Sequence, residues 1–160
     1  DDDDTKGSLV FQRGSSQGSA EKEGGREEKK TRRRGRKEVV EALDREGTGH
    51  AEAGRMKEAL GCWHRALQLC SEDEKRLRAV LYEQASQAYL ELESTFDAIS
   101  SATSAIEIDP TYIHAYTSLA RAQLNHGEPQ LSLATLQRAV QLDPTNKEIR
   151  EEMEQVRNLC

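Results

Sequence analysis

The amino-acid sequence predicts an all-α fold, a short right-handed α-solenoid of three helix-turn-helix pairs with a capping helix after them. Two apolar-periodic segments between residues 109 and 146 lie on either side of a glycine and a proline, Gly127 and Pro129. An Asp-Pro pair stands at each end of this stretch, and Pro110 and Pro144 are 34 positions apart. Helical segments punctuated at such a period are typical of repeat arrays, in which neighbouring hairpins bury each other's apolar faces.

The small and apolar residues of this last pair have counterparts 34 positions earlier, as a repeat requires. Small residues let two helices approach closely, and larger apolar side chains fill the space between them. We therefore assign repeats to residues of about 40–73, 79–112 and 113–146, and a capping helix to 147–158. The matched positions are Tyr116 with Tyr82, Ala120 with Ser86, Ser132 with Ala98, Ala139 with Ala105, Val140 with Ile106, and Asp143-Pro144 with Asp109-Pro110.

Residues 1–37 precede the repeats as a charged tail. Apart from Leu9, Val10 and Phe11 they hold almost no apolar residues, so we expect this tail to be disordered. A basic run at 29–37 has three interpretations: a solvated linker, a nuclear-localisation signal, or a phosphate-binding segment for nucleic acid. No aromatic residue is interleaved with its cations, which disfavours nucleic acid bound by base stacking. The cations are Lys29, Lys30, Arg32, Arg33, Arg34, Arg36 and Lys37.

The first repeat is expected to pair a helix at residues 41–54 with one at 56–70. Gly54 suits the left-handed residue that ends the first helix, as Gly127 does in the third repeat. Gly47 takes a small position of the first helix, and Trp63 takes a large apolar position of the second.

Five extra residues join the first repeat to the second. Ser71 and Glu74 have the spacing of a capping box, so the next helix is expected to begin near Glu72 and to run about one turn longer than usual. Thr145 and Glu148 have the same spacing before the last helix.

Composition narrows the class of protein. The chain has 160 residues, a net charge of −6 and 35% hydrophobic residues, which suit one modest domain with a charged tail. No apolar run has the length of a membrane span, and three cysteines without a CxxC motif favour a reducing, intracellular setting. The chain begins at Asp1 rather than Met and ends inside a helical pattern at Cys160, so we expect a fragment or a processed form.

The repeats resemble the tetratricopeptide repeat (TPR) family. The family's aromatic and small positions fall on Tyr116 and Ala120, and its proline falls on Pro144. The resemblance implies a curved array in which the first helix of each pair lines a concave, partner-binding face. Over about residues 36–160 the chain also resembles a small vertebrate three-repeat family that has a basic segment before its first repeat.

On this alignment, the concave positions expected to bind a partner are acidic in the first two repeats and mildly basic in the third. A partner with a basic segment against the first repeats is therefore favoured. The positions are Asp44 and Thr48 in repeat one, Glu83, Gln84, Gln87 and Glu91 in repeat two, and His114, Ser118, Arg121 and Asn125 in repeat three.

The resemblance also allows a test for one known TPR function, the binding of chaperone C-terminal tails through a Lys- and Arg-containing carboxylate clamp. The five clamp positions here hold no Lys or Arg, so donors for a bidentate grip are missing. This disfavours a co-chaperone role. The positions are Asp44, Thr48, Gln84, His114 and Ser118.

These observations predict a monomeric, non-enzymatic adaptor of the nucleus or cytoplasm that binds a peptide or helix of a partner protein. No nucleophile motif or phosphate-binding loop is present, and no cofactor is implied. Cys62 and His64 with Cys70 resemble a metal site only weakly, because repeat packing explains their helix, so no metal site is predicted. The alternatives are a chaperone-tail co-chaperone and an RNA-associated factor acting through the basic run.

Overall fold

The computed structural model describes residues 17–160, of which residues 17–35 belong to one unit and residues 36–160 to a second, compact unit. Seven helices are present in the described residues, none of which forms a strand. They are α1 (Gln17–Glu52), α2 (Met56–Leu69), α3 (Lys75–Glu91), α4 (Thr95–Ile108), α5 (Ile113–Asn125), α6 (Pro129–Leu142) and α7 (Lys147–Arg157). The predicted all-α solenoid with its capping helix is confirmed.

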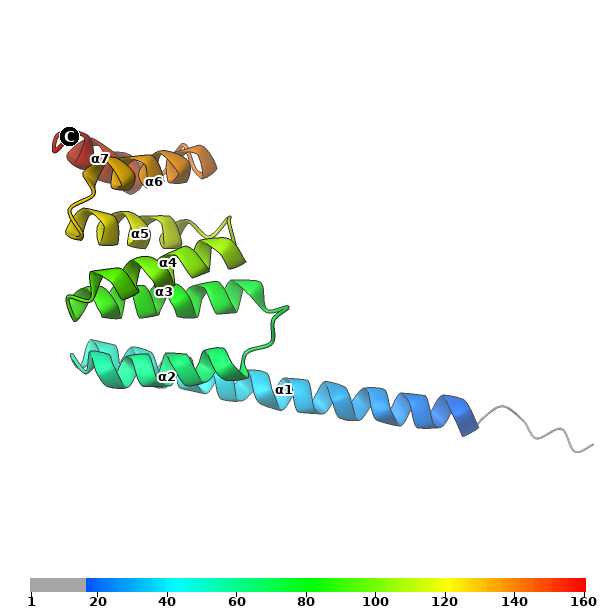
Figure 1. Cartoon of the computed structure of the whole chain (residues 1–160). Coiled ribbons are helices and arrows are strands. Elements are labelled where there is room, and N and C mark those ends of the chain that lie inside the picture. Colours follow the sequence, from blue (N-terminus) through cyan, green and yellow to red (C-terminus); the bar gives the residue numbers. More distant parts are fainter. Residues whose placement is uncertain (1–16) are drawn as a thin grey trace, which may run out of the picture. The chain divides into compact units, whose positions relative to one another are not determined.

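Helices α2 to α7 form a stack in which each helix packs against the next along the chain (Figure 1). Helix α3 also contacts α5, so the first helices of successive repeats are neighbours. This arrangement places side chains from α3 and α5 on a common face. None of the described helices has the length and apolar character that crossing a membrane requires.

The turn of each helix pair places a left-handed residue at the same repeat position. Gly54 has φ of 78° and Gly127 has φ of 84°, so both glycine predictions are confirmed. In the second repeat the equivalent residue is Glu93, with φ of 60°. The backbone of the turn is therefore common to all three repeats, even where the residue is not the glycine that this conformation favours.

Buried serines join the two helices of the second and third repeats. The Ser86 hydroxyl donates to the Ala98 carbonyl at 2.7 Å, and the Ser132 hydroxyl donates to the Ala120 carbonyl at 2.7 Å. Because Ser86 and Ala120 are equivalent positions, donor and acceptor exchange helices between the two repeats. A small side chain at each position permits this close approach.

The first helix, predicted at residues 41–54, begins earlier, because α1 starts at Gln17 inside the tail that was expected to be disordered. Every described side chain from residue 21 to 39 is exposed, so packing does not hold this part of the helix. Its Glu, Lys and Arg residues have high helix propensity, and Arg32 pairs with Glu28 at 2.7 Å across one turn. Residues 1–16 of the tail predicted to be disordered, with their Leu9–Phe11 cluster, lie outside the described residues.

Helix α3 has 17 residues against 13 in α5, which confirms the predicted extra turn. It begins at Lys75 rather than near Glu72, because the Ser71 hydroxyl bonds to Asp73 instead of capping the helix. The capping box predicted at Thr145 is also wrong. Asn146 caps α7 by accepting from the Ile149 amide at 3.2 Å.

Candidate functional site

Two neighbouring cavities form a groove along α3. The first cavity, about 360 Å³, is lined by residues of α1, α2 and α3 together with Tyr112. The second, about 440 Å³, is lined by residues of α3, α5 and α7 and the turns beside them. Glu83, Gln87 and Tyr112 line both cavities, so we treat the two as one groove.

Most of the concave positions expected from the sequence lie in this groove. Three do not line it: Asp44 is half-buried, Asn125 is exposed, and Ser118 is only 2% exposed. Ser118 is therefore not the outward-facing residue that the sequence predicted. The expected positions that line the groove are Thr48, Glu83, Gln84, Gln87, Glu91, His114 and Arg121.

Glu83 lies in the middle of the groove and is only 4% exposed. Its carboxylate accepts from the Ser118 hydroxyl at 2.7 Å and from the Gln87 amide. The first bond joins α3 to α5, which explains why Ser118 is buried. A buried carboxylate needs such donors. Burying a neutral polar group without a hydrogen bond costs about 2–7 kcal/mol, and burying a charge without one costs more.

Two aromatic residues, neither of them predicted from the sequence as a site residue, contribute to the groove. Trp63 is 3% exposed, so it belongs to the core as predicted, yet its side chain also lines the first cavity. Tyr112 directly precedes α5 and is half-buried. Burial, together with the nearby Glu83 charge, raises the pKa of Tyr112 to about 12. The Arg76 guanidinium lies 5.0 Å from its ring centroid.

The charges of the groove are unevenly distributed. The charged residues of the first cavity are all acidic, namely Glu52, Glu83 and Glu91. The second cavity contains two arginines, and both are ion-paired: Arg76 with Asp109 at 2.6 Å, and Arg121 with Glu152. The groove therefore presents carboxylates that its own cations do not balance.

No model of a known protein family matches the sequence. Over 121 residues the chain is 38% identical to tetratricopeptide repeat protein 33 of Mus musculus, covering 76% of this chain and 44% of that protein. The Xenopus laevis protein of the same name is 36% identical over 110 residues, covering 69% of this chain and 41% of that protein.

A solved structure has the same fold. The first TPR of Spaghetti (RPAP3), bound to the HSP90 peptide SRMEEVD, matches with a TM-score of 0.69 and 20% identity, over 76% of this chain and 95% of that chain. The chain belongs to the tetratricopeptide repeat family. It spans about two fifths of the length of the curated TPR proteins described above.

The basic run of this TPR protein lies on α1, and every side chain from Lys29 to Lys37 is exposed. Arg32 takes part in the ion pair with Glu28. The run therefore offers its cations to solvent from a helical backbone.

Cys62, His64 and Cys70, whose types weakly resemble a metal site, each contact different residues in the TPR helices. Cys70 lies 3.5 Å from Glu74 Oε2, and His64 Nε2 lies 3.3 Å from the Tyr89 hydroxyl. Cys62 is half-buried on α2, next to Glu46 and His50 of α1. The spacing of Cys62, His64 and Cys70 in the sequence does not indicate this contact with Glu46 and His50.

We expect Cys70 to be the slowest of the three cysteines to react with iodoacetamide. Burial and the Glu74 carboxylate raise the pKa of its thiol to about 11. Only about one such thiol in a thousand is ionised at a pH of about 8, and the thiolate is the reactive form. Intact-mass measurements over time should show Cys160, which is exposed, labelled first. Labelling of Cys70 as fast as Cys160 in the native protein would contradict this order.

Proposed function

We propose that this TPR domain is a non-enzymatic adaptor whose groove binds a basic segment of a partner protein. The main support for the proposal is the lining of the first cavity, which combines the acidic residues Glu52, Glu83 and Glu91 with the apolar residues Met56 and Trp63. Long basic side chains suit such a site, because their methylene stems pack on apolar surface while their charged ends reach carboxylates.

The second cavity supports the same class of partner. Its arginines are ion-paired with acidic residues of the domain, so they attract an acidic ligand less than unpaired cations would. Residues 39–160 also carry 12 basic and 20 acidic side chains. A field of this sign speeds the approach of a basic partner and repels an acidic one.

Intrinsic fluorescence can test this proposal directly, because Trp63 is the only tryptophan of the chain and lines the first cavity. Two amidated peptides of equal length form a matched pair: SRMEEVD, and SRMKKVK with each acidic residue replaced by lysine. We expect a saturable change in Trp63 emission with SRMKKVK, weakened by added salt, and none with SRMEEVD.

A charge-reversal variant in the groove gives a second test of the same proposal. Glu91→Lys should weaken binding of the basic peptide by roughly fivefold, because it replaces an attraction by a repulsion. Glu107→Lys makes the same change of net charge at an exposed position of α4 that does not line the groove, and it should leave the affinity unchanged. Equal affinities in the two variants, or saturable binding of SRMEEVD, would contradict the proposal.

A co-chaperone role fits the groove less well, although the RPAP3 domain binds an HSP90 peptide on a similar fold. That peptide, SRMEEVD, is acidic, and the clamp positions identified from the sequence include Asp44 and no Lys or Arg. Another clamp position, Ser118, donates its hydroxyl to Glu83. This contact places a carboxylate beside a position that would have to hold an anion.

For the basic run at 29–37, we propose a role in nuclear import rather than in RNA binding. Its seven cations are exposed, and no aromatic residue is interleaved among them for base stacking. A fluorescent fusion of the chain should lose nuclear accumulation when Arg32, Arg33 and Arg34 are replaced by glutamine. Unchanged localisation, together with salt-sensitive RNA binding that the same change abolishes, would favour the RNA-associated alternative.

A further inference from the structure

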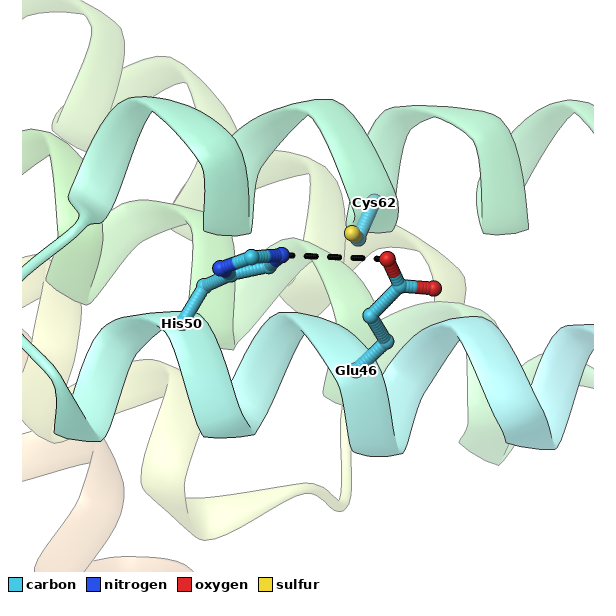
Figure 2. A group of neighbouring side chains, drawn as sticks. All are labelled: Glu46, His50 and Cys62. Carbon is cyan, nitrogen blue, oxygen red and sulfur yellow. Dashed lines mark ion pairs between the residues drawn. The ribbon is translucent and has the colours of Figure 1, made fainter.

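Away from the groove-lining residues, three metal-ligating side chains converge between α1 and α2. Glu46 and His50 lie on α1, and Cys62 lies on α2 (Figure 2). One potential ligand atom from each residue lies within 4.8 Å of the other two, and His50 Nε2 is 3.7 Å from Glu46 Oε1. The latter separation is close to that between two ligands of one tetrahedral zinc ion, given bond lengths of about 2.0–2.2 Å.

The fold explains why these residues meet. Glu46 and His50 are four positions apart, so they lie on the same face of α1. Gly54, with φ of 78°, turns the chain back and brings α2 alongside α1. At Gly47 the backbone of α1 approaches the Trp63 ring closely, which fixes the neighbouring Cys62 opposite Glu46.

We propose that Glu46, His50 and Cys62 bind one Zn²⁺ ion, with water in the fourth position. A thiolate, an imidazole and a carboxylate are the donor types that zinc uses in proteins, and sites with three protein ligands keep an open position. The thiolate and the carboxylate together balance the charge of the ion. The side chain of Glu46 is 61% exposed and that of His50 is 25% exposed, so the ion can enter from solvent.

Arg55 gives the site a distinctive property. Its Nε–H donates to His50 Nδ1 at 3.1 Å, so Nδ1 acts as an acceptor and the ring proton lies on Nε2. Zinc at Nε2 requires the other tautomer, with the proton on Nδ1. The hydrogen bond from Arg55 therefore favours the His50 tautomer that cannot bind zinc through Nε2, and the positive charge of Arg55 also opposes binding of a cation.

Occupation of the site would link the two helices of the first repeat. The loop closed between His50 and Cys62 contains the whole turn, so the ion would oppose separation of α1 from α2. A ligand that binds only the folded form raises stability. Thermal unfolding of the full chain should therefore shift to higher temperature with added Zn²⁺ and return with a chelator.

The test uses the full chain and Co²⁺, which reports a thiolate ligand through a ligand-to-metal charge-transfer band in the near ultraviolet. We expect one Co²⁺ per chain, displaced by Zn²⁺. Cys62→Ser should abolish the band, and Glu46→Gln, which changes an exposed side chain and should not affect folding, should weaken affinity by about tenfold or more. Arg55→Gln should tighten binding, because it frees His50 Nδ1 to carry the proton.

Cys70→Ser and Cys160→Ser are the matched controls, since they remove the other two thiols of the chain. Both should keep the band and the affinity. The proposal is overturned if the wild-type chain gives no band, if the band depends on Cys160, or if Glu46→Gln and Arg55→Gln both leave the affinity unchanged.

Discussion

Leu136→Ala is expected to lower the free energy of unfolding by about 2–5 kcal/mol, through lost apolar burial and the cavity left behind. Leu136 is 0% exposed on α6 and belongs to the core cluster that also contains Leu119 and Ile149. It therefore contributes to packing in the third repeat and against the capping helix. Urea denaturation followed by circular dichroism measures the change.

Leu131→Ala on the same helix is the matched control. Leu131 is 51% exposed, so removing the same atoms should change stability by no more than about 0.5 kcal/mol. Because repeats are stabilised by their neighbours, loss at Leu136 should also make the third repeat unfold before the other two. Similar urea midpoints for the two variants would show that the third repeat does not depend on this core position.

Local signals made much of the fold predictable. Gly54 and Gly127 mark turns because a left-handed residue costs glycine least, and Pro129 begins a helix because its missing N–H is no loss there. The small residues of each repeat were recognisable from their spacing alone, since that spacing is what two close helices require. Each of these inferences depends on residues near one another in the sequence.

The scarcity of apolar residues before residue 38 predicts a disordered tail where the structure has the first part of α1. Apolar residues determine whether a segment packs, whereas Glu, Lys and Arg favour a helix that packs against nothing. The capping boxes predicted before α3 and α7 are also wrong. Several side chains in each turn can accept or donate a hydrogen bond, and spacing alone does not show that Ser71 bonds to Asp73.

Features of the candidate sites that depend on contacts between helices could not be predicted from the sequence. Ser118 is equivalent to an outward position in the repeat, yet Glu83 from the previous repeat holds its hydroxyl. The meeting of Cys62 with Glu46 and His50 depends on how α2 is aligned against α1. A repeat pattern predicts which residues face a neighbouring helix, but it does not predict which pairs of side chains are in contact.

Gly47→Ala is expected to destabilise the first repeat by about 1–3 kcal/mol, despite the higher helix propensity of alanine. A Cβ at residue 47 would lie 2.6 Å from Trp63 Nε1 and 2.9 Å from two carbons of the same ring. Trp63 is 3% exposed, so its ring cannot move away without disturbing the core. Thermal and urea unfolding, with Trp63 emission as the local signal, measure both the loss and its location.

Gly49→Ala, two residues further along α1, separates helix propensity from packing. A Cβ there meets nothing within 4 Å, so this variant should be more stable by about 0.5–1 kcal/mol. Since Gly47 sets the approach of α1 to α2, its replacement should weaken both Co²⁺ binding and the Trp63 response to a basic peptide, whereas Gly49→Ala should preserve both. Stabilisation by both substitutions would contradict a close approach at Gly47, and with it the alignment of helices on which the two proposed sites depend.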